Sequence, residues 1–275
     1  MIRAFKLEWL KLKHYRIFWV LFGIYLLAQL VITNGGVFVL EWLRDLGADF
    51  DGLDPTMIPI YDFPDIWQNT SWMGSFIKIL IAFIVIISVN NDLSYNTMRQ
   101  NIIDGVSKKE FILSKFSLVL FLAAICTIVL FTSGLVTGFI YSSVTDIKYV
   151  LDELEFVVAY FYQLVVFSML AFLVGLVIKK AGFAIVLLFF YSSFLEPIVT
   201  AILEHADPIK DQTASLAKFF PVYSVNNLIH VPFQRYFFQE IQDNVLWYEW
   251  LIATGWLVIF TYLIVFILNK RDLKA

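Results

Sequence analysis

The sequence predicts an all-α integral membrane protein, with six transmembrane helices and an N-terminal interfacial helix in a single domain over residues 1–275. Composition is the first observation behind this prediction, since 60% of the residues are hydrophobic and only 16% are charged. The mean hydropathy of +0.78 is the second. An average soluble domain is about 25% charged. Because a soluble core cannot hide so much apolar surface, lipid must be the solvent for much of the chain.

The third observation is that the apolar residues gather in six runs, each near the ~20 residues that a helix needs to cross the hydrocarbon. Aromatic residues that favour the membrane interface, among them Trp72, Tyr141 and Trp247, lie near the ends of these runs. The predicted spans are Ile17–Thr33, Trp72–Val89, Phe116–Tyr141, Phe156–Ile178, Ala181–Leu203 and Trp250–Leu268.

The positive charges predict the orientation. Residues 1–16, the segment 90–115, the pair Lys179–Lys180 and the tail after Leu268 carry five, four, two and three of the 20 Lys and Arg residues. All four stretches fall on the same side of the predicted membrane. The positive-inside rule therefore places both termini in the cytoplasm.

The first sixteen residues predict a helix lying in the inner headgroup layer rather than a cleavable signal peptide. Ile2, Phe5, Trp9 and Leu12 are spaced by three and four residues, which gives one apolar face, and basic residues lie off that face. A signal peptide would show a short apolar run and a small-residue cleavage site instead. The alternative is a basic flank that only sets the topology.

Several function classes lack their sequence signals. The net charge of −3 disfavours nucleic acid, and no G-x-x-x-x-G-K-[ST] string is present for binding nucleotide phosphates. The three histidines are scattered, the acidic stretch DFDGLD at 49–54 lacks EF-hand spacing, and Asn90-Asn91-Asp92 has no second acid one turn away to complete a magnesium–diphosphate site. Cys126 stands alone, so no disulfide forms within the chain. We therefore expect no catalytic residue, cofactor or metal.

The segment 90–115 is compact, charged and interrupted by glycine, between two apolar runs. Gly105 can end a short surface helix because glycine tolerates a left-handed backbone. Ser107 and Glu110 have the spacing of a capping box for the next helix. The sequence thus predicts a shaped, charged cytoplasmic projection, which suits docking of a partner rather than chemistry.

The string DLSYNTMRQNIIDGVSKKEFILSK resembles the cytoplasmic segment after the second span of ABC-2 type transporter permeases. In that family an acidic residue, Thr-x-[Arg/Lys], Gly-x-[Ser/Pro]-[Arg/Lys] and Lys recur at about this spacing, and the tail NKRDLK is also similar. Asp92 stands where glutamate is more usual, which keeps the charge. The positions that match are Asp92, Thr97, Arg99, Gly105, Ser107, Lys108 and Lys115.

The resemblance implies the membrane-spanning subunit of an ABC transporter, most simply an exporter in a bacterial inner membrane. Such a permease is not an enzyme: it pairs with a second permease copy and receives energy from a separate ATP-binding subunit that docks on the segment 90–115. A non-transporting immunity or sensory partner of an ABC ATPase is the alternative. The implied docking residues are Asp92, Thr97, Arg99, Gly105, Ser107, Lys108 and Lys109.

Two charges fall inside predicted spans, Lys78 in the second and Glu196 in the fifth, at similar depths below the outer surface. Intramembrane charges usually face the protein interior and find partners. We therefore predict that Lys78 and Glu196 pair, against the alternative that each reaches water by itself. The outer loop 204–249 is partly apolar and fits either short re-entrant helices or a folded external cap.

Overall fold

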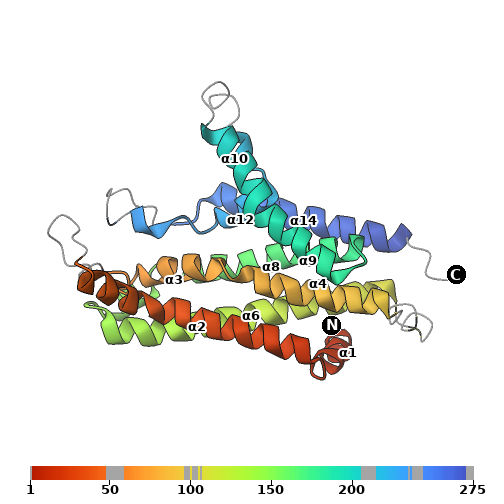
Figure 1. Ribbon diagram of the computed structural model, residues 1–275, viewed down its shortest axis with the longest axis horizontal. Coiled ribbons are helices and arrows are strands. Elements are labelled where there is room, and N and C mark those ends of the chain that lie inside the picture. Colours follow the sequence, from red (N-terminus) through yellow and green to blue (C-terminus); the bar gives the residue numbers. More distant parts are fainter. Residues whose placement is uncertain are drawn as a thin grey trace.

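The computed structural model describes residues 2–47, 59–95, 107–205, 215–234 and 244–270, with residues 100, 105 and 236, and these parts are helical without a strand (Figure 1). A short α1 precedes long helices that run side by side. The elements are α1 (Ile2–Leu12), α2 (Arg16–Asp45), α3 (Ile66–Ser75), α4 (Lys78–Ser94), α6 (Lys108–Tyr141), α7 (Ile147–Leu151), α8 (Glu155–Val177), α9 (Ala181–Phe190), the π-helix η2 (Tyr191–Leu195), α10 (Glu196–His205), α12 (Pro221–Asn226), the 3-10 helix η3 (Pro232–Gln234) and α14 (Trp247–Lys270).

Each predicted span corresponds to a helical segment. Five segments of the described chain are long and apolar enough to cross a membrane, and α3 with α4 makes a sixth if this bent pair counts as one span. The continuous helix predicted over Trp72–Val89 is corrected here, because α3 and α4 meet at a bend of 45°. The bend follows Gly74 and Ser75, and adjacent glycine and serine are a common cause of helix kinks.

The helix that contains the first predicted span is longer than that span. The polar stretch that begins at Asn34 suggests an end at Thr33, yet α2 continues to Asp45. The whole helix has 30 residues and is about 45 Å long at 1.5 Å per residue. Contacts with other helices hold this extension in place: Thr137 donates a hydrogen bond to the Asn34 side chain (2.6 Å), and the Gly36 N–H donates to the Tyr61 hydroxyl (2.8 Å). Tertiary contacts thus override the weak helix propensity of Asn and Gly.

The fifth span contains a π-helical turn, η2, between α9 and α10. Pro197 follows this turn directly, and proline lacks the N–H that would continue the regular hydrogen-bond ladder. The kink expected at Pro197 therefore takes the form of a π-turn just before it. In Figure 1, α9 and α10 (teal) cross the other long helices at a steep angle, and α10 leaves the bundle.

Helix α8 lies in the core and is buried along its whole length. It approaches α4 closely at Gly175, where an added Cβ would lie 3.3 Å from the Ile86 Cα, and the Asn90 side chain donates to the Gly175 carbonyl (3.0 Å). A buried polar group also joins α8 to α2, since Tyr160 donates to Gln29 at 3.0 Å. The spans are therefore held together by hydrogen bonds as well as by apolar packing.

Helix α6 carries Gly134 and Gly138, a spacing that predicts close packing. Aromatic rings fill this face: an added Cβ would lie 2.3 Å from the Phe63 ring at Gly138, and 3.1 Å from the Trp67 ring at Gly134. The space left by the two glycines is thus occupied by side chains at and just before α3.

Candidate functional site

A buried cluster of four charges joins α1, α4 and α6. Lys115, near the start of α6, contacts the Glu8 carboxylate of α1 and lies 2.6 Å from the Asp92 carboxylate near the end of α4. Lys11 of α1 lies 2.8 Å from the other Asp92 oxygen. Ser88 completes the group, donating to Glu8 (2.6 Å) and accepting from Lys115 (2.7 Å). Two acids and two lysines make the cluster neutral overall.

Burial makes this neutrality necessary. Lys115 is 1% exposed and Asp92 3% exposed, and an isolated charge at such a place would be very costly. Charge-assisted hydrogen bonds compensate for the lost hydration. Glu8 and Lys11 reach the cluster together because residues three apart share one side of a helix.

The apolar face of α1 packs on the same helices. The Phe5 and Trp9 rings lie 5.0 and 5.5 Å from the Phe121 ring of α6. Leu12 is buried. The predicted amphipathic helix is therefore confirmed as a helix, and it is attached to the transmembrane bundle through both its apolar and its charged sides. The interpretation as a basic flank that only sets topology does not account for these contacts.

The cluster lies at the base of the segment 90–115 that is predicted to dock a partner, because Asp92 and Lys115 are near the two ends of that segment. Gly105 has φ +93°, as predicted for a glycine that breaks a helix. Ser107 caps α6 in a complete capping box with Glu110, at 2.8 Å and 3.2 Å. Thr97 and Arg99 lie outside the described residues.

Lys108 and Lys109 have different surroundings. The Lys108 ammonium donates to the Leu268 carbonyl (2.8 Å) and more weakly to the Asn269 carbonyl (3.4 Å), at the end of α14. A cation there donates hydrogen bonds to the terminal carbonyl groups and is attracted by the negative end of the helix dipole. Lys109 is exposed. Lys108 thus ties the start of α6 to α14, and Lys109 faces outward.

One predicted docking residue needs correction. Asp92 is buried and both of its oxygens face lysines, so its carboxylate anchors the segment and does not present a surface to a partner. Glu8 and Lys11 were not predicted. A signal existed for Glu8, because it is the single acidic residue among the first forty and lies in an otherwise basic helix.

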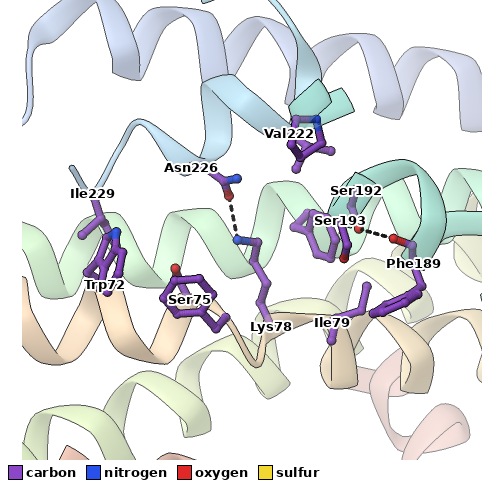
Figure 2. Close-up of a pocket in the computed structure, with 13 residues that line it drawn as sticks. Trp72, Ser75, Lys78, Ile79, Phe189, Ser192, Ser193, Val222, Asn226 and Ile229 are labelled. Carbon is purple, nitrogen blue, oxygen red and sulfur yellow. Dashed lines mark hydrogen bonds between the residues drawn. The ribbon is translucent and has the colours of Figure 1, made fainter. Parts of the chain in front are cut away.

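The predicted contact between Lys78 and Glu196 is wrong for the described structure, because α12 lies between them. The Glu196 carboxylate accepts from the backbone N–H groups of Val222 and Tyr223 (both 2.7 Å) at the start of α12. Lys78 donates to the Asn226 side chain (2.7 Å) at the end of α12, as Figure 2 shows. Each charge is at the end of α12 that the helix dipole favours.

A cavity of about 420 Å³ lies beside Lys78 (Figure 2). It borders both helix irregularities, the bend between α3 and α4 and the π-turn η2, and α12 forms another wall. Its walls are mostly aromatic and aliphatic, with a few hydroxyl and amide groups. The lining residues are Trp72, Ser75, Phe76, Lys78, Ile79, Phe167, Phe189, Ser192, Ser193, Pro197, Val222, Asn226 and Ile229.

Comparison with known proteins identifies the family. No curated protein matches the chain. A family model described as "ABC-2 family transporter protein" matches residues 4–194, more than half of the chain. The match includes α1, the segment 90–115 and the ion cluster, and it ends before Glu196 and α12. The chain therefore belongs to the ABC-2 family of transporter proteins, and it is a multi-pass permease subunit of an ABC transporter.

Proposed function

We propose that this permease is the membrane subunit of an exporter in a bacterial inner membrane, and that a separate ABC ATPase drives it by docking on the segment 90–115. The observation that carries the proposal is the anchoring of both ends of that segment. Asp92 and Lys115 meet in one buried cluster, and Lys108 is held by α14. A push on the segment would therefore be transmitted to α1, α4, α6 and α14 together.

Rigid anchoring matters because coupling needs an element with discrete positions rather than a flexible link. If the ATP-driven conformational change separated the members of the cluster, their charges would be left unpaired in a buried place. The cluster thus favours movement of α1 and the adjoining helix ends as one body. Binding of the ATPase to the docking segment would then shift the spans to which the segment is attached.

The proposal includes a second permease copy and an orientation. Along α9, Ala184 and Leu188 are the buried positions, while Phe183, Val186 and Phe190 are exposed. An apolar face of this kind can contact lipid or a second permease copy. Because ABC-2 permeases pair, we expect a second copy to cover part of this α9 face. The concentration of Lys and Arg around the docking segment supports a cytoplasmic position for that end of the bundle.

Capture of the ATPase from native membranes tests the docking surface. The double variant Arg99→Glu/Lys109→Glu reverses two cations of the segment without touching the buried cluster. We expect normal membrane insertion and loss of most of the co-purified ABC ATPase. The matched control is Lys180→Glu, an exposed cation on the connection between α8 and α9. Equal ATPase capture by the double variant and the wild type would refute docking on this segment.

Direction of transport needs a second measurement. Proteoliposomes that contain the permease and its ATPase should deplete candidate cargo from the ATPase side in an ATP-dependent manner. Candidate cargo consists of compounds to which a strain lacking the permease becomes sensitive. ATPase capture without any ATP-dependent movement would favour the non-transporting immunity or sensory role.

A further inference from the structure

The cavity beside Lys78 combines a large apolar wall with one buried lysine amine. The aromatic rings of Trp72, Phe76, Phe167 and Phe189 supply much of the wall. Phe76 and Phe189 line the cavity and are more than 40% exposed, so part of its wall lies at the surface of the described bundle. An aromatic pocket with a few polar groups is the usual form of a small-molecule site.

Lys78 has neutral partners within the described parts of the chain. Its side chain is buried (8% exposed), Nζ donates to the Asn226 amide oxygen at 2.7 Å, and Nζ lies 5.4 Å from the centre of the Phe167 ring. Within the described parts of the chain, no carboxylate forms an ion pair with it. Glu196, the predicted partner, is engaged by α12. An ammonium group at this site therefore has no described counter-charge and would gain one from an anionic ligand.

The position of Lys78 in its helix adds to this imbalance. Lys78 is the first residue of α4, and the N-terminal end of a helix carries a partial positive charge. A cation at that end is locally unfavourable, whereas an anion is favoured there. An ammonium group has three N–H donors, and Asn226 takes one of them. The hydroxyl groups of Ser75 and Ser192 also line the cavity. The Ser192 hydroxyl already donates to the Phe189 carbonyl (3.4 Å), so the remaining donors of Lys78 and the N-terminal end of α4 are the groups that suit an anionic ligand.

We propose that this cavity binds a membrane amphiphile that carries an anionic headgroup, a phosphate or a carboxylate. The headgroup pairs with Lys78, and the apolar body lies among Trp72, Phe76 and Phe189 and extends toward the exposed side of the two phenylalanines. The volume of about 420 Å³ suits a headgroup and the adjoining part of an acyl chain. A purely zwitterionic or neutral ligand would leave the charge of Lys78 uncompensated.

Fluorescence of Trp72 offers a direct readout, because this residue lines the cavity and bromine atoms quench tryptophan on contact. The purified full chain is placed in nanodiscs with increasing fractions of dibrominated phosphatidylglycerol, a brominated fatty acid, or dibrominated phosphatidylcholine. The chain has eight tryptophans, so the same titration on Trp72→Phe isolates the Trp72 signal. Neither anionic probe requires the ATPase, so the result does not depend on the docking proposal.

We expect at least one anionic probe to quench Trp72 at a roughly tenfold lower mole fraction than phosphatidylcholine, which is the factor given by about 1.4 kcal/mol. Lys78→Gln should remove this preference. Asn226→Asp is the sharper variant, because it keeps the acceptor for Lys78 and the link to α12 while supplying the missing negative charge. It should leave the protein folded and abolish the preference. The control Lys148→Gln, an exposed cation on α7, should retain it.

Each result decides the proposal. Equal quenching by anionic and zwitterionic probes would overturn it, as would a preference that survives Asn226→Asp. Relief of the quenching by millimolar inorganic phosphate would assign the site to a small free anion and overturn the amphiphile. A preference for the phosphatidylglycerol probe over the fatty acid would support a phosphate headgroup, and the reverse would support a carboxylate.

Discussion

Replacing Lys115 by methionine should destabilise this permease strongly. Lys115 contacts Glu8 and Asp92, and its Nζ also lies 2.7 Å from the Ser88 hydroxyl and 3.2 Å from the Ser88 carbonyl. The variant would leave two buried carboxylates with Lys11 as their remaining cation. Removing one partner of a buried ion pair typically costs about 3–5 kcal/mol. Methionine keeps most of the apolar stem, so packing contributes little to this loss.

A double-mutant cycle separates the electrostatic cost from any packing defect. In Lys115→Met/Glu8→Gln, one acid and one lysine are removed together, and the Lys11–Asp92 pair at 2.8 Å remains. We expect the double variant to be more stable than the sum of the two single effects predicts, by about 1–3 kcal/mol. Unfolding in mixed micelles with increasing denaturing detergent, followed by circular dichroism, measures each free energy.

The control for this prediction is Lys109→Met, which removes an exposed cation from the first turn of the same helix. Exposed substitutions away from special contacts usually change stability by less than about 0.5 kcal/mol. If Lys115→Met behaves like Lys109→Met, or if the double variant shows simple additivity, the buried cluster does not stabilise the base of the docking segment.

Three further predictions concern backbone contacts. Gly138→Ala places a Cβ 2.3 Å from the Phe63 ring and should lower stability by about 1–3 kcal/mol in the same unfolding assay, whereas Gly182→Ala, with open space around it, should not. Gly105→Ala forces an alanine into the left-handed region at φ +93°, at a local cost of about 1–2 kcal/mol. It should reduce the amount of captured ATPase while changing the free energy of unfolding little. Glu196→Leu leaves two N–H groups of α12 without their acceptor, at about 1–3 kcal/mol each, and hydrogen exchange in 221–226 should accelerate; unchanged exchange would contradict this role.

Local signals in the sequence predicted much of the fold. Apolar length predicted a helical segment for each of the six runs, one of them bent, because a helix in lipid must satisfy its own backbone hydrogen bonds. The Ser107–Glu110 capping box and the glycine turn at Gly105 were also predictable, since both depend on residues close together in the chain. Helix breaks were less accessible: the sequence places Gly74 and Ser75 in an apolar run, and only packing decides whether such a pair bends the helix.

The candidate sites were harder to predict because their partners are distant in sequence. Lys78 and Glu196 have opposite charges and similar depth, which suggested a direct pair, yet the residues that bind them come from α12. A six-residue helix inside a long loop gives too short a pattern to be recognised by periodicity. Lys115 was noted for its motif position, and its bond to Glu8 spans 107 residues. Hydropathy and spacing carry no information about such contacts.

The two buried lysines, Lys78 at the start of α4 and Lys115 of α6 beside the end of α4, allow the structural and binding roles to be distinguished. Lys115 is neutralised by carboxylates that belong to the fold, so the free energy of its ion pairs contributes to unfolding. Lys78 is held by an amide and an aromatic ring, so any counter-charge from outside the fold contributes to binding instead. Glutamine at position 78 could still donate to Asn226, whereas methionine at position 115 restores none of the lost contacts. The electrostatics of this permease therefore require a specific combination of results. Lys115→Met should lose much of the stability, and Lys78→Gln should lose the preference for anionic probes.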